Sequence, residues 1–384
     1  MPAPVSARSL ARAVLVAAAA AAATAACGRP RLPAALDPPR AVELPAPLWE
    51  PQPAASAAAG GASLRGVRAV SAAVAWASGS KGTVIRTADG GRTWRRLALP
   101  AAAAELDFRS VWAFDSLTAV VASAGEAERG LARIYRTADG GRTWALAHQD
   151  TARGVFYDAV AFWDRDHGLV LSDPVDIGGG RRRFVVLSTL DGGRTWSRTP
   201  AAGMPDALPG EAAFAAGNAA LAVAGTTRAW FVTGGPGGAR VFHTATGGAR
   251  WDVVAAPVGT PRSESAGLFA AAFATPDVGL VAGGDFTAAR SGARQFARTE
   301  DGGKTWQLTD LNGTAPGYWS GLAHVPGGGT TFVAVGGGGT AVSRDAGRTW
   351  AVVDSAGLHA VSFARGGVGW GVGGRGTVVK ARAR

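Results

Sequence analysis

Residues 87–94 read Thr-Ala-Asp-Gly-Gly-Arg-Thr-Trp, and the same eight residues recur at positions 137–144. Four related segments end at Trp196, Trp251, Trp306 and Trp350, so successive motif tryptophans lie 50, 52, 55, 55 and 44 residues apart. A repeat of roughly 40–50 residues that carries several short strands is the signature of a β-propeller blade. The motif therefore predicts an all-β propeller.

The centre of each motif is a polar turn between two strand-like segments, as at residues 82–86 and 93–97 around the first copy. Its paired glycines can adopt positive φ, and the short aspartate can accept backbone N–H groups of its own turn. Identical residues in every blade cannot converge on one site. We therefore expect a structural role for the motif aspartates, which are Asp89, Asp139, Asp191, Asp301 and Asp345.

A seventh repeat follows the sixth motif but contains no motif of its own. Residues 359–363, 368–372 and 376–380 predict three strands, and no segment for a fourth strand follows them. Upstream, residues 47–51 read Pro-Leu-Trp-Glu-Pro and supply the tryptophan that an outer strand needs. We therefore expect seven four-stranded antiparallel blades, closed by an N-terminal strand near Trp49.

The first residues are typical of export. Residues 1–26 combine two arginines with an alanine-rich apolar run, which predicts a signal peptide. Cys27, the single cysteine, follows two alanines and is expected to carry a lipid; the alternative is cleavage after Ala26, which would give a soluble secreted protein. Residues 27–46 are expected to form a flexible tether, and residues 47–384 the propeller. These expectations describe a monomeric cell-envelope protein, attached to a membrane by its lipid alone.

The formal net charge of +11 raises the question of a nucleic-acid partner. The arginines are scattered over the repeats, so we expect no nucleic acid, although the charge could steer acidic partners. The five histidines are dispersed, and no dinucleotide-binding loop or cysteine pair is present. We therefore assign no metal and no cofactor, and oxidoreductase activity is only a minor alternative.

A binding site is expected where residues break the repeat. In a propeller, the connectors between blades and the loops between second and third strands share the face opposite the motif turns. Arg65, Arg109, Tyr157, Asp158, Glu211 and Tyr318 are placed at or near starts of first strands, and Asp173, Arg240 and Asp285 in loops between second and third strands. These nine residues are our predicted ligand- or partner-binding face; the alternative is a rim of ion pairs and caps. Their mixed charges suit an envelope protein or a small charged ligand.

The repeated motif resembles the Asp box, or BNR repeat, of sialidases, other glycoside hydrolases, sortilin-type receptors and photosystem II stability/assembly-factor propellers. Residues 82–91 and 370–378 look like blades of the last group. Residues 171–174 and 283–285 resemble a bacterial branch of that group whose activity is unknown. The resemblance implies an exported, seven-bladed propeller with a non-enzymatic assembly or scaffold role.

The main alternative is a glycoside hydrolase. Sialidases use a tyrosine nucleophile assisted by a carboxylate, and the pairs on offer are Tyr157 with Asp158 and Tyr318 with Glu211. The Arg-Ile-Pro motif of sialidases is absent. Because no nucleophile, base and orienting partner can be assigned together, we assign no catalytic residue and favour a binding or scaffold protein.

Overall fold

The computed structural model describes residues 42–288, 294–309, 311 and 317–382. The predicted signal peptide, Cys27 and the tether as far as residue 41 lie outside the described residues.

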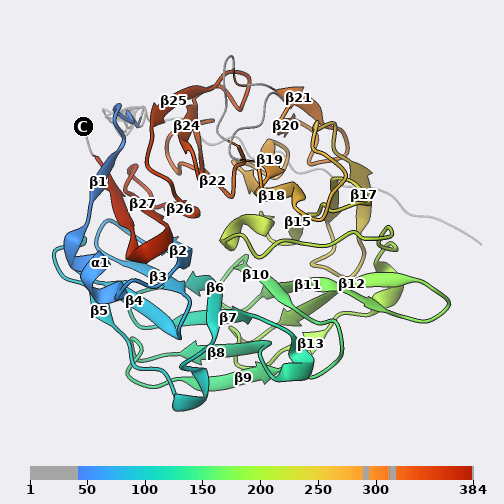
Figure 1. Ribbon diagram of the computed structural model, residues 1–384, viewed down its shortest axis with the longest axis horizontal. Helices are drawn as coiled ribbons and strands as arrows, with labels where there is room; N and C mark the ends of the chain where they lie inside the picture. Colours follow the sequence, from blue (N-terminus) through green and yellow to red (C-terminus); the bar gives the residue numbers. More distant parts are fainter. Residues whose placement is uncertain (1–41, 289–293, 310, 312–316, 383–384) are drawn as a thin grey trace, which may run out of the picture. The chain divides into compact units, whose positions relative to one another are not determined.

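Seven four-stranded antiparallel sheets form a ring, and every described strand belongs to one of them (Figure 1). Blade 1 contains β2 (Leu64–Ala69), β3 (Ala75–Gly79), β4 (Thr83–Thr87) and β5 (Arg95–Arg96). Blade 2 contains β6 (Asp107–Ala113), β7 (Ala119–Ala124), β8 (Arg133–Thr137) and β9 (Ala145–Gln149). Blade 3 contains β10 (Tyr157–Phe162), β11 (Gly168–Asp176), β12 (Arg182–Thr189) and β13 (Ser197–Arg198).

The remaining blades repeat this order from the centre outward. Blade 4 contains β14 (Leu221–Ala224), β15 (Arg228–Val232), β16 (Arg240–Thr244) and β17 (Asp252–Ala255). Blade 5 contains β18 (Ala266–Phe273), β19 (Gly279–Asp285), β20 (Phe296–Thr299) and β21 (Gln307–Thr309). Blade 6 contains β22 (Gly321–His324), β23 (Phe332–Gly336), β24 (Gly339–Ser343) and β25 (Ala351–Asp354). The predicted seven-bladed fold is confirmed.

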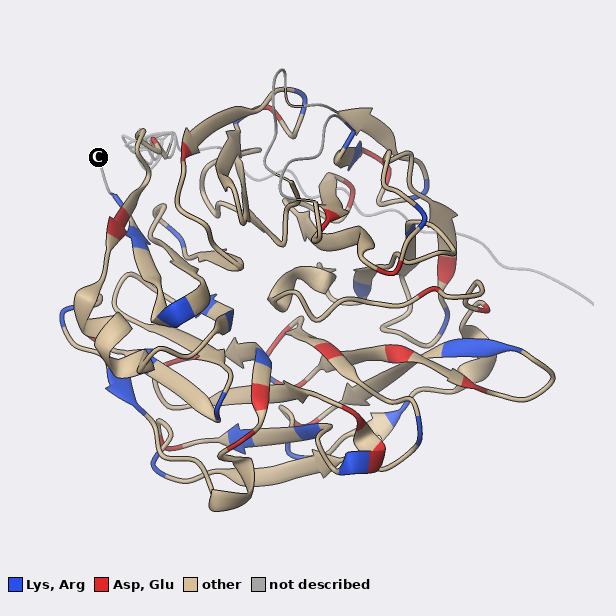
Figure 2. Cartoon of the chain, in the orientation of Figure 1, with Lys and Arg blue, Asp and Glu red and all other residues tan. Residues whose placement is uncertain are grey.

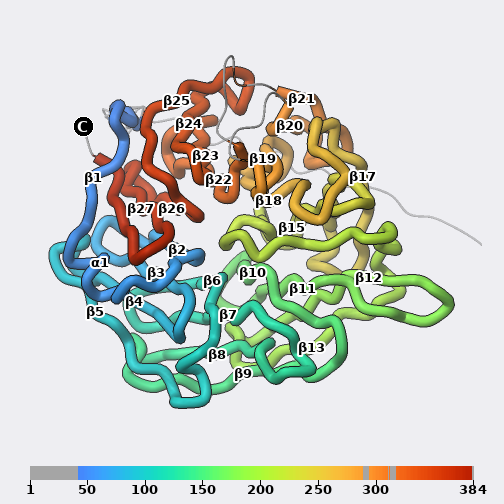
Figure 3. The backbone as a smooth tube through the Cα atoms, viewed as in Figure 1, coloured from blue at the N-terminus to red at the C-terminus, as the bar shows by residue number. Residues whose placement is uncertain are grey.

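Blade 7 joins the two ends of the described chain. Its strands are β26 (Ala360–Phe363), β27 (Gly369–Val372), β28 (Val378–Ala381) and β1 (Trp49–Pro51). β1 pairs antiparallel with β28, with Trp49 opposite Ala381, and the two strands lie side by side in Figure 3. The Trp49 indole N–H also donates a 2.7 Å hydrogen bond to Thr340 Oγ1. The predicted closure is confirmed, and β28 is left with no open edge.

The chain packs against the ring before β1 begins and continues as a helix after it. Leu44, in the expected tether, is buried in a cluster with Val335 and Leu358. After β1, the chain forms helix α1 (Pro53–Ala59), whose alanines at positions 55 and 59 are fully buried. Alanine has the highest helix propensity, and residues four apart share one helix face, so this run forms a short helix once a surface covers it.

The core lies between neighbouring blades, and the motif tryptophans form part of it. The Trp94 ring meets Trp370 of β27 edge-on, with ring centroids 5.2 Å apart. Trp144 meets Trp76 of β3 in the same way at 6.4 Å. Trp350 stacks on Phe296 of β20 at 4.4 Å. In each of these pairs, the aromatic contact ties one blade to the preceding blade.

The motif turns have one hydrogen-bond pattern. In blade 1, Asp89 Oδ1 accepts from the Thr93 backbone N–H (2.9 Å) and Oδ2 accepts from the Thr93 hydroxyl (2.6 Å). The other four motif aspartates make equivalent bonds. In the degenerate fourth copy, Thr246 Oγ1 accepts the Arg250 N–H instead. The carboxylates are therefore used within their own turns.

These turns also define the two faces of the ring. Gly90 N–H donates to Ala73 O (2.8 Å), which joins the motif turn of blade 1 to the turn between its first two strands. Equivalent bonds recur in blades 2 to 6. We call the face that carries both kinds of turn the turn face. The opposite face, which carries the connectors between blades, is the connector face.

Candidate functional site at the connector face

A segment of blade 4 crosses the middle of the ring on the connector face. Residues 211–220, which we call the central segment, precede β14 and include the short 3-10 helix η4 (Asn218–Ala220). This yellow-green stretch lies at the centre of Figure 1. Asn218 clamps it to β6, because its amide donates to Val111 O (2.6 Å) and its carbonyl accepts from Val111 N–H (3.3 Å). The central segment therefore fills the middle of the ring at its connector-face end, which we call the mouth.

Three of the predicted site residues hold the central segment in place. Arg65 Nη1 donates to Ala216 O (3.5 Å), and Arg109 Nη1 donates to Ala215 O (3.4 Å). Asp173 Oδ1 accepts from the Ala213 N–H (2.9 Å). These side chains come from three different blades. The sequence placed them on one face correctly, but their shared contact with residues 211–220 depends on tertiary structure.

Glu211 and Arg240 form a buried ion pair. Arg240 Nε donates to Glu211 Oε1 at 2.8 Å, and Arg240 Nη2 donates to the other carboxylate oxygen. The Thr233 hydroxyl (2.6 Å) and the Leu208 N–H (2.8 Å) also donate to Glu211, whose side chain has no exposed surface. Both charges are thus used in anchoring the start of the central segment. Glu211 has no surface left for a partner, and contact between Arg240 and a partner stays a prediction.

Two arginines at the mouth remain partly open to solvent. Arg109 forms a 2.8 Å ion pair with Asp107, and both side chains are about one third exposed. Burial, followed by repulsion from Arg109, lowers the pKa of Arg65, while Asp107 and Tyr318 act in the opposite direction. The His359 Nδ1–H donates to Leu64 O (2.9 Å), and burial, followed by repulsion from Arg65, lowers the pKa of His359. The mouth therefore presents two guanidinium groups against one carboxylate.

Below this layer lies a pair of carboxyl groups. Asp158 is buried, and neither of its oxygens has a hydrogen-bond partner among the described residues. Burial and the neighbouring Asp173 raise the pKa of Asp158 well above its usual range. Burial also raises the pKa of Asp173 to about 6. Tyr157 is also buried, its hydroxyl has no hydrogen-bond partner among the described residues, and burial raises its pKa. None of these three side chains therefore lies on an open surface.

An aromatic cluster on the connector face was missed by the sequence analysis. Phe214 of the central segment lies edge-on to Phe269 of β18, with ring centroids 4.7 Å apart. Phe286, which follows β19, lies 6.4 Å from Phe214, and Tyr318 lies 5.9 Å from Phe269. Phe286 is 51% exposed. In the sequence, two phenylalanines outside the repeated strands, at positions 214 and 286, could have indicated this cluster.

The close approach of two glycines makes room for this cluster. A Cβ atom on Gly234 would lie 2.4 Å from Gly267 Cα and 2.8 Å from the Phe214 ring. Backbone atoms cannot yield to such a contact, so only glycine allows the central segment to pair with Gly234 through its Ala212 backbone. The position of Phe214 therefore depends on a packing requirement that the repeat pattern does not contain.

Several predicted positions need correction. Glu211 lies ten residues before β14 rather than at the start of a first strand, because the central segment is inserted there. Asp173 lies inside β11 at a bulge, and Arg240 begins β16, so neither is in a loop. Asp285 ends β19 and caps the next turn, accepting from the Thr287 N–H (2.9 Å) and hydroxyl (2.7 Å).

Charge is spread around the ring, with lysines and arginines interspersed among the acidic residues (Figure 2). Within the described ranges, no group of three or more His, Cys, Asp or Glu side chains could hold a metal ion. No helix in the described part of the chain is long and apolar enough to cross a membrane.

The fold is similar to that of several solved structures. No protein-family model and no curated protein matches this chain. Among solved structures, YCF48 bound to a D1 peptide is similar, with a TM-score of 0.58, 16% identity, and coverage of 89% of this chain and all of that chain. YCF48 from Cyanidioschyzon merolae follows, with a TM-score of 0.56, 16% identity and coverage of 87% and 99%.

A glycoside hydrolase is similar to the same degree. The GH74 xyloglucanase from Xanthomonas campestris has a TM-score of 0.57 and 18% identity, covering 86% of this chain but 53% of that enzyme. At these identities the similarity shows the propeller fold alone. YCF48 and a xyloglucanase share that fold, so activity has to be argued from the site.

Proposed function

We propose that this chain is a non-enzymatic scaffold that binds a protein partner on its connector face. The observation that carries the proposal is the aromatic cluster of Phe214, Phe269, Phe286 and Tyr318. Tyr318 interacts electrostatically with Arg65, which in turn interacts with Arg109. Aromatic residues and arginine dominate the energetic centres of protein interfaces. A rigid ring presents them without the loss of loop entropy that weakens many complexes.

The charge of the mouth indicates the kind of partner. Asp107 is the carboxylate paired with Arg109, and it also interacts with Arg65. Asp173 accepts from the Ala213 N–H of the central segment, and Asp158 is buried near Asp173. A partner segment with an acidic side chain next to an aromatic or aliphatic one would match both features. Electrostatic attraction would raise the rate of association, and the exposed ring of Phe286 would add apolar contact area.

The comparisons support this proposal without deciding it. YCF48 is a propeller of similar fold whose structure contains a bound D1 peptide. We propose by analogy that this chain engages an envelope protein, and that it belongs to the bacterial branch of Asp-box propellers. The motif turns support that placement through their common hydrogen-bond pattern.

Glycoside hydrolysis is the rival activity, and the geometry argues against it. The Tyr157 hydroxyl is buried, and Glu211 is fully engaged by Arg240, Thr233 and Leu208. Neither tyrosine–carboxylate pair therefore offers an accessible nucleophile together with a free carboxylate. A general acid or base must reach the proton that it transfers.

We further propose that the protein is exported and anchored through a lipid on Cys27. The sequence of residues 1–27 supports this location. Changing Cys27→Ser should move the protein from the membrane fraction to the soluble fraction. Mass spectrometry that finds an unmodified Cys27 in the mature chain would contradict the anchor.

The binding proposal can be tested by photo-crosslinking in the native envelope. A benzophenone amino acid at position 286 should yield one discrete protein adduct, and the change Arg65→Glu should abolish it. The matched control is position 190, because Leu190 is also an exposed apolar residue, 76% exposed, but lies in a motif turn on the turn face. Equal adducts at both positions, or persistence of the adduct in the Arg65→Glu variant, would contradict the proposed interface. Hydrolysis of a glycoside by the purified protein, lost on Tyr318→Phe, would favour an enzyme instead.

A further inference from the structure

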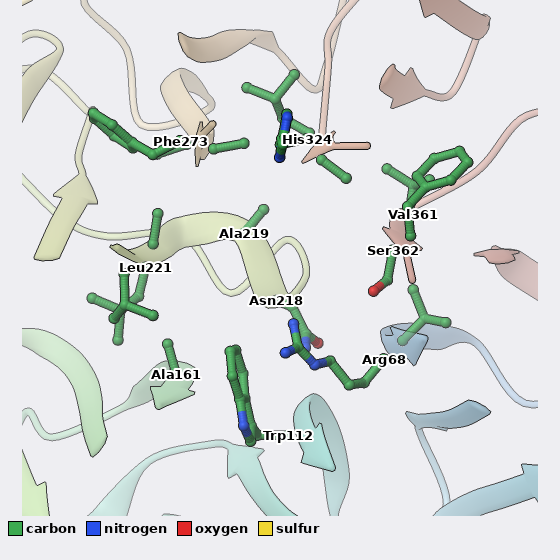
Figure 4. Close-up of a pocket in the computed structure, with 18 of the residues that line it drawn as sticks. Arg68, Trp112, Ala161, Asn218, Ala219, Leu221, Phe273, His324, Val361 and Ser362 are labelled. Atoms are coloured by element: carbon green, nitrogen blue, oxygen red, sulfur yellow. The ribbon is translucent and has the colours of Figure 1, made fainter. Parts of the chain in front are cut away.

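The opposite, turn-face end of the ring contains a cavity in its centre. The cavity has a volume of about 240 Å³ and is lined by residues from all seven innermost strands. Most of the lining residues, as in β2, β6 and β18, come from the later positions of those strands, which lead into the turn face. The central segment forms its floor through Asn218 and Ala219, which are labelled in Figure 4. The channel is thus blocked on the connector face and hollow toward the turn face.

One charged side chain dominates this cavity. Arg68 of β2 and His324 of β22 are its titratable lining residues, and no carboxylate lines it. Burial lowers the pKa of Arg68 to about 10, so its guanidinium group remains protonated at neutral pH. Burial also lowers the pKa of His324, whose Nε2 lies 2.8 Å from Gly329 O. Among the described residues that line it, the cavity therefore holds one positive charge and no counter-charge.

Arg68 is held in position but not neutralised. Its guanidinium carbon lies 3.6 Å from the centre of the Trp112 ring, and Figure 4 shows the group beside Trp112 and Asn218. Its Nε atom is buried, and it has no hydrogen-bond partner among the described residues. Asn218 is occupied with the Val111 backbone. The ring thus orients a planar donor group and leaves its N–H groups unshared.

Arg68 is half-buried, its Nε atom is buried without a partner, and its guanidinium group has no ion-pair partner among the described residues, so the cavity favours an anion. The rest of the wall is mainly aliphatic and aromatic, including Leu221, Phe273 and Val361. A guanidinium group binds a planar carboxylate through two parallel hydrogen bonds, and the apolar wall would accept a hydrocarbon body. An inorganic anion would leave that wall facing water. The volume is smaller than that of common drug-sized pockets, about 300 Å³ or more, which limits the ligand to a small one.

We propose that the turn-face cavity binds a small organic carboxylate, with Arg68 as the carboxylate receptor and the apolar channel wall around the ligand body. A free metabolite or the end of a peptide chain could supply the same carboxylate. This site is separate from the proposed partner-binding surface on the connector face, so each can fail without the other.

Titration calorimetry of the full chain can test the proposal, with benzoate and its neutral analogue benzamide as probes. Benzoate should bind at least tenfold more tightly than benzamide. The change Arg68→Met should weaken benzoate at least tenfold, because it keeps an unbranched side chain and removes the charge. The matched control is Arg92→Met, since Arg92 is an exposed arginine in a motif turn, outside the cavity. That variant should bind benzoate as the unchanged protein does.

A second pair of probes identifies the source of the carboxylate. An acetylated Ala-Ala-Phe peptide with a free carboxyl end is compared with its amide. A tenfold preference for the acid in either pair of probes supports the site, and the pair that shows it identifies the source. If acid and amide bind equally in both pairs, or if neither acid binds at millimolar concentration, the proposal is overturned. Should Arg68→Met fail to fold, these comparisons on the unchanged protein still decide.

Discussion

The buried pair of Glu211 and Arg240 allows a quantitative test of how the central segment is held. The perturbation is Arg240→Ala, which removes two of the four hydrogen bonds to Glu211 and leaves its carboxylate buried. Removing one partner of a buried ion pair typically costs about 3–5 kcal/mol. Thr233 and Leu208 still donate to Glu211, so we expect a loss near the lower end, about 3 kcal/mol.

Thermal unfolding converts this loss into a measurable shift. With an unfolding entropy of roughly 2.1 cal/mol/K per residue over roughly 340 residues, about 3 kcal/mol corresponds to a fall in Tm of about 4 °C. The control is Arg181→Ala. It removes an ion pair to Asp206 in which both side chains are exposed by two fifths or more, and should cost less than about 1 kcal/mol.

A double variant separates the ion pair from general damage to the site. Glu211→Met with Arg240→Met removes both charges and should be more stable than Arg240→Ala, because no uncompensated carboxylate remains. The reasoning is refuted if Arg240→Ala lowers Tm no more than Arg181→Ala does. It is also refuted if the double variant is less stable than the single one.

Three further outcomes are expected. Deleting residues 42–52 removes β1 and exposes the edge of β28, so the protein should melt at lower temperature and aggregate more readily; an unchanged Tm would contradict the closure. Hydrogen bonds from Thr93 lower the pKa of Asp89 to about 2, so the ionised carboxylate stabilises the fold above about pH 4 and this contribution is lost as pH falls toward 2. In thermal melts at stepped pH, Asp89→Asn should have a lower Tm than the unchanged protein above about pH 4, and its Tm should fall less between about pH 4 and about pH 2. Burial raises the pKa of Asp158, so the folded state holds a proton that the unfolded chain releases near pH 4, and the stability of the fold decreases as pH rises. Asp158→Asn should therefore have a higher Tm than the unchanged protein at pH 7, and this difference in Tm should shrink toward pH 4. A difference in Tm that does not change with pH would contradict the assignment.

The sequence by itself determined the architecture of this protein. The recurrence of Asp-Gly-Gly turns and their tryptophans specifies blade, strand order and face, because each unit forms its turn through local hydrogen bonds. The closing strand was also readable, since the seventh repeat lacks an outer strand and residues 47–51 supply one. Turns and strands specified by such local patterns form in any fold that buries the same side chains of each strand.

Only the tertiary structure decided the site. The partnership of Glu211 with Arg240, the crossing of the central segment over the ring, and the solitary charge of Arg68 all join residues from different strands or blades. The insertion before β14 removed Glu211 from its repeat position, and spacing alone could not show that it crosses the centre. The physical reason is that the repeat specifies only the strands, turns and packing contacts that all blades have in common. A channel lining is set by seven strands that meet in space, at positions where their sequences are free to differ.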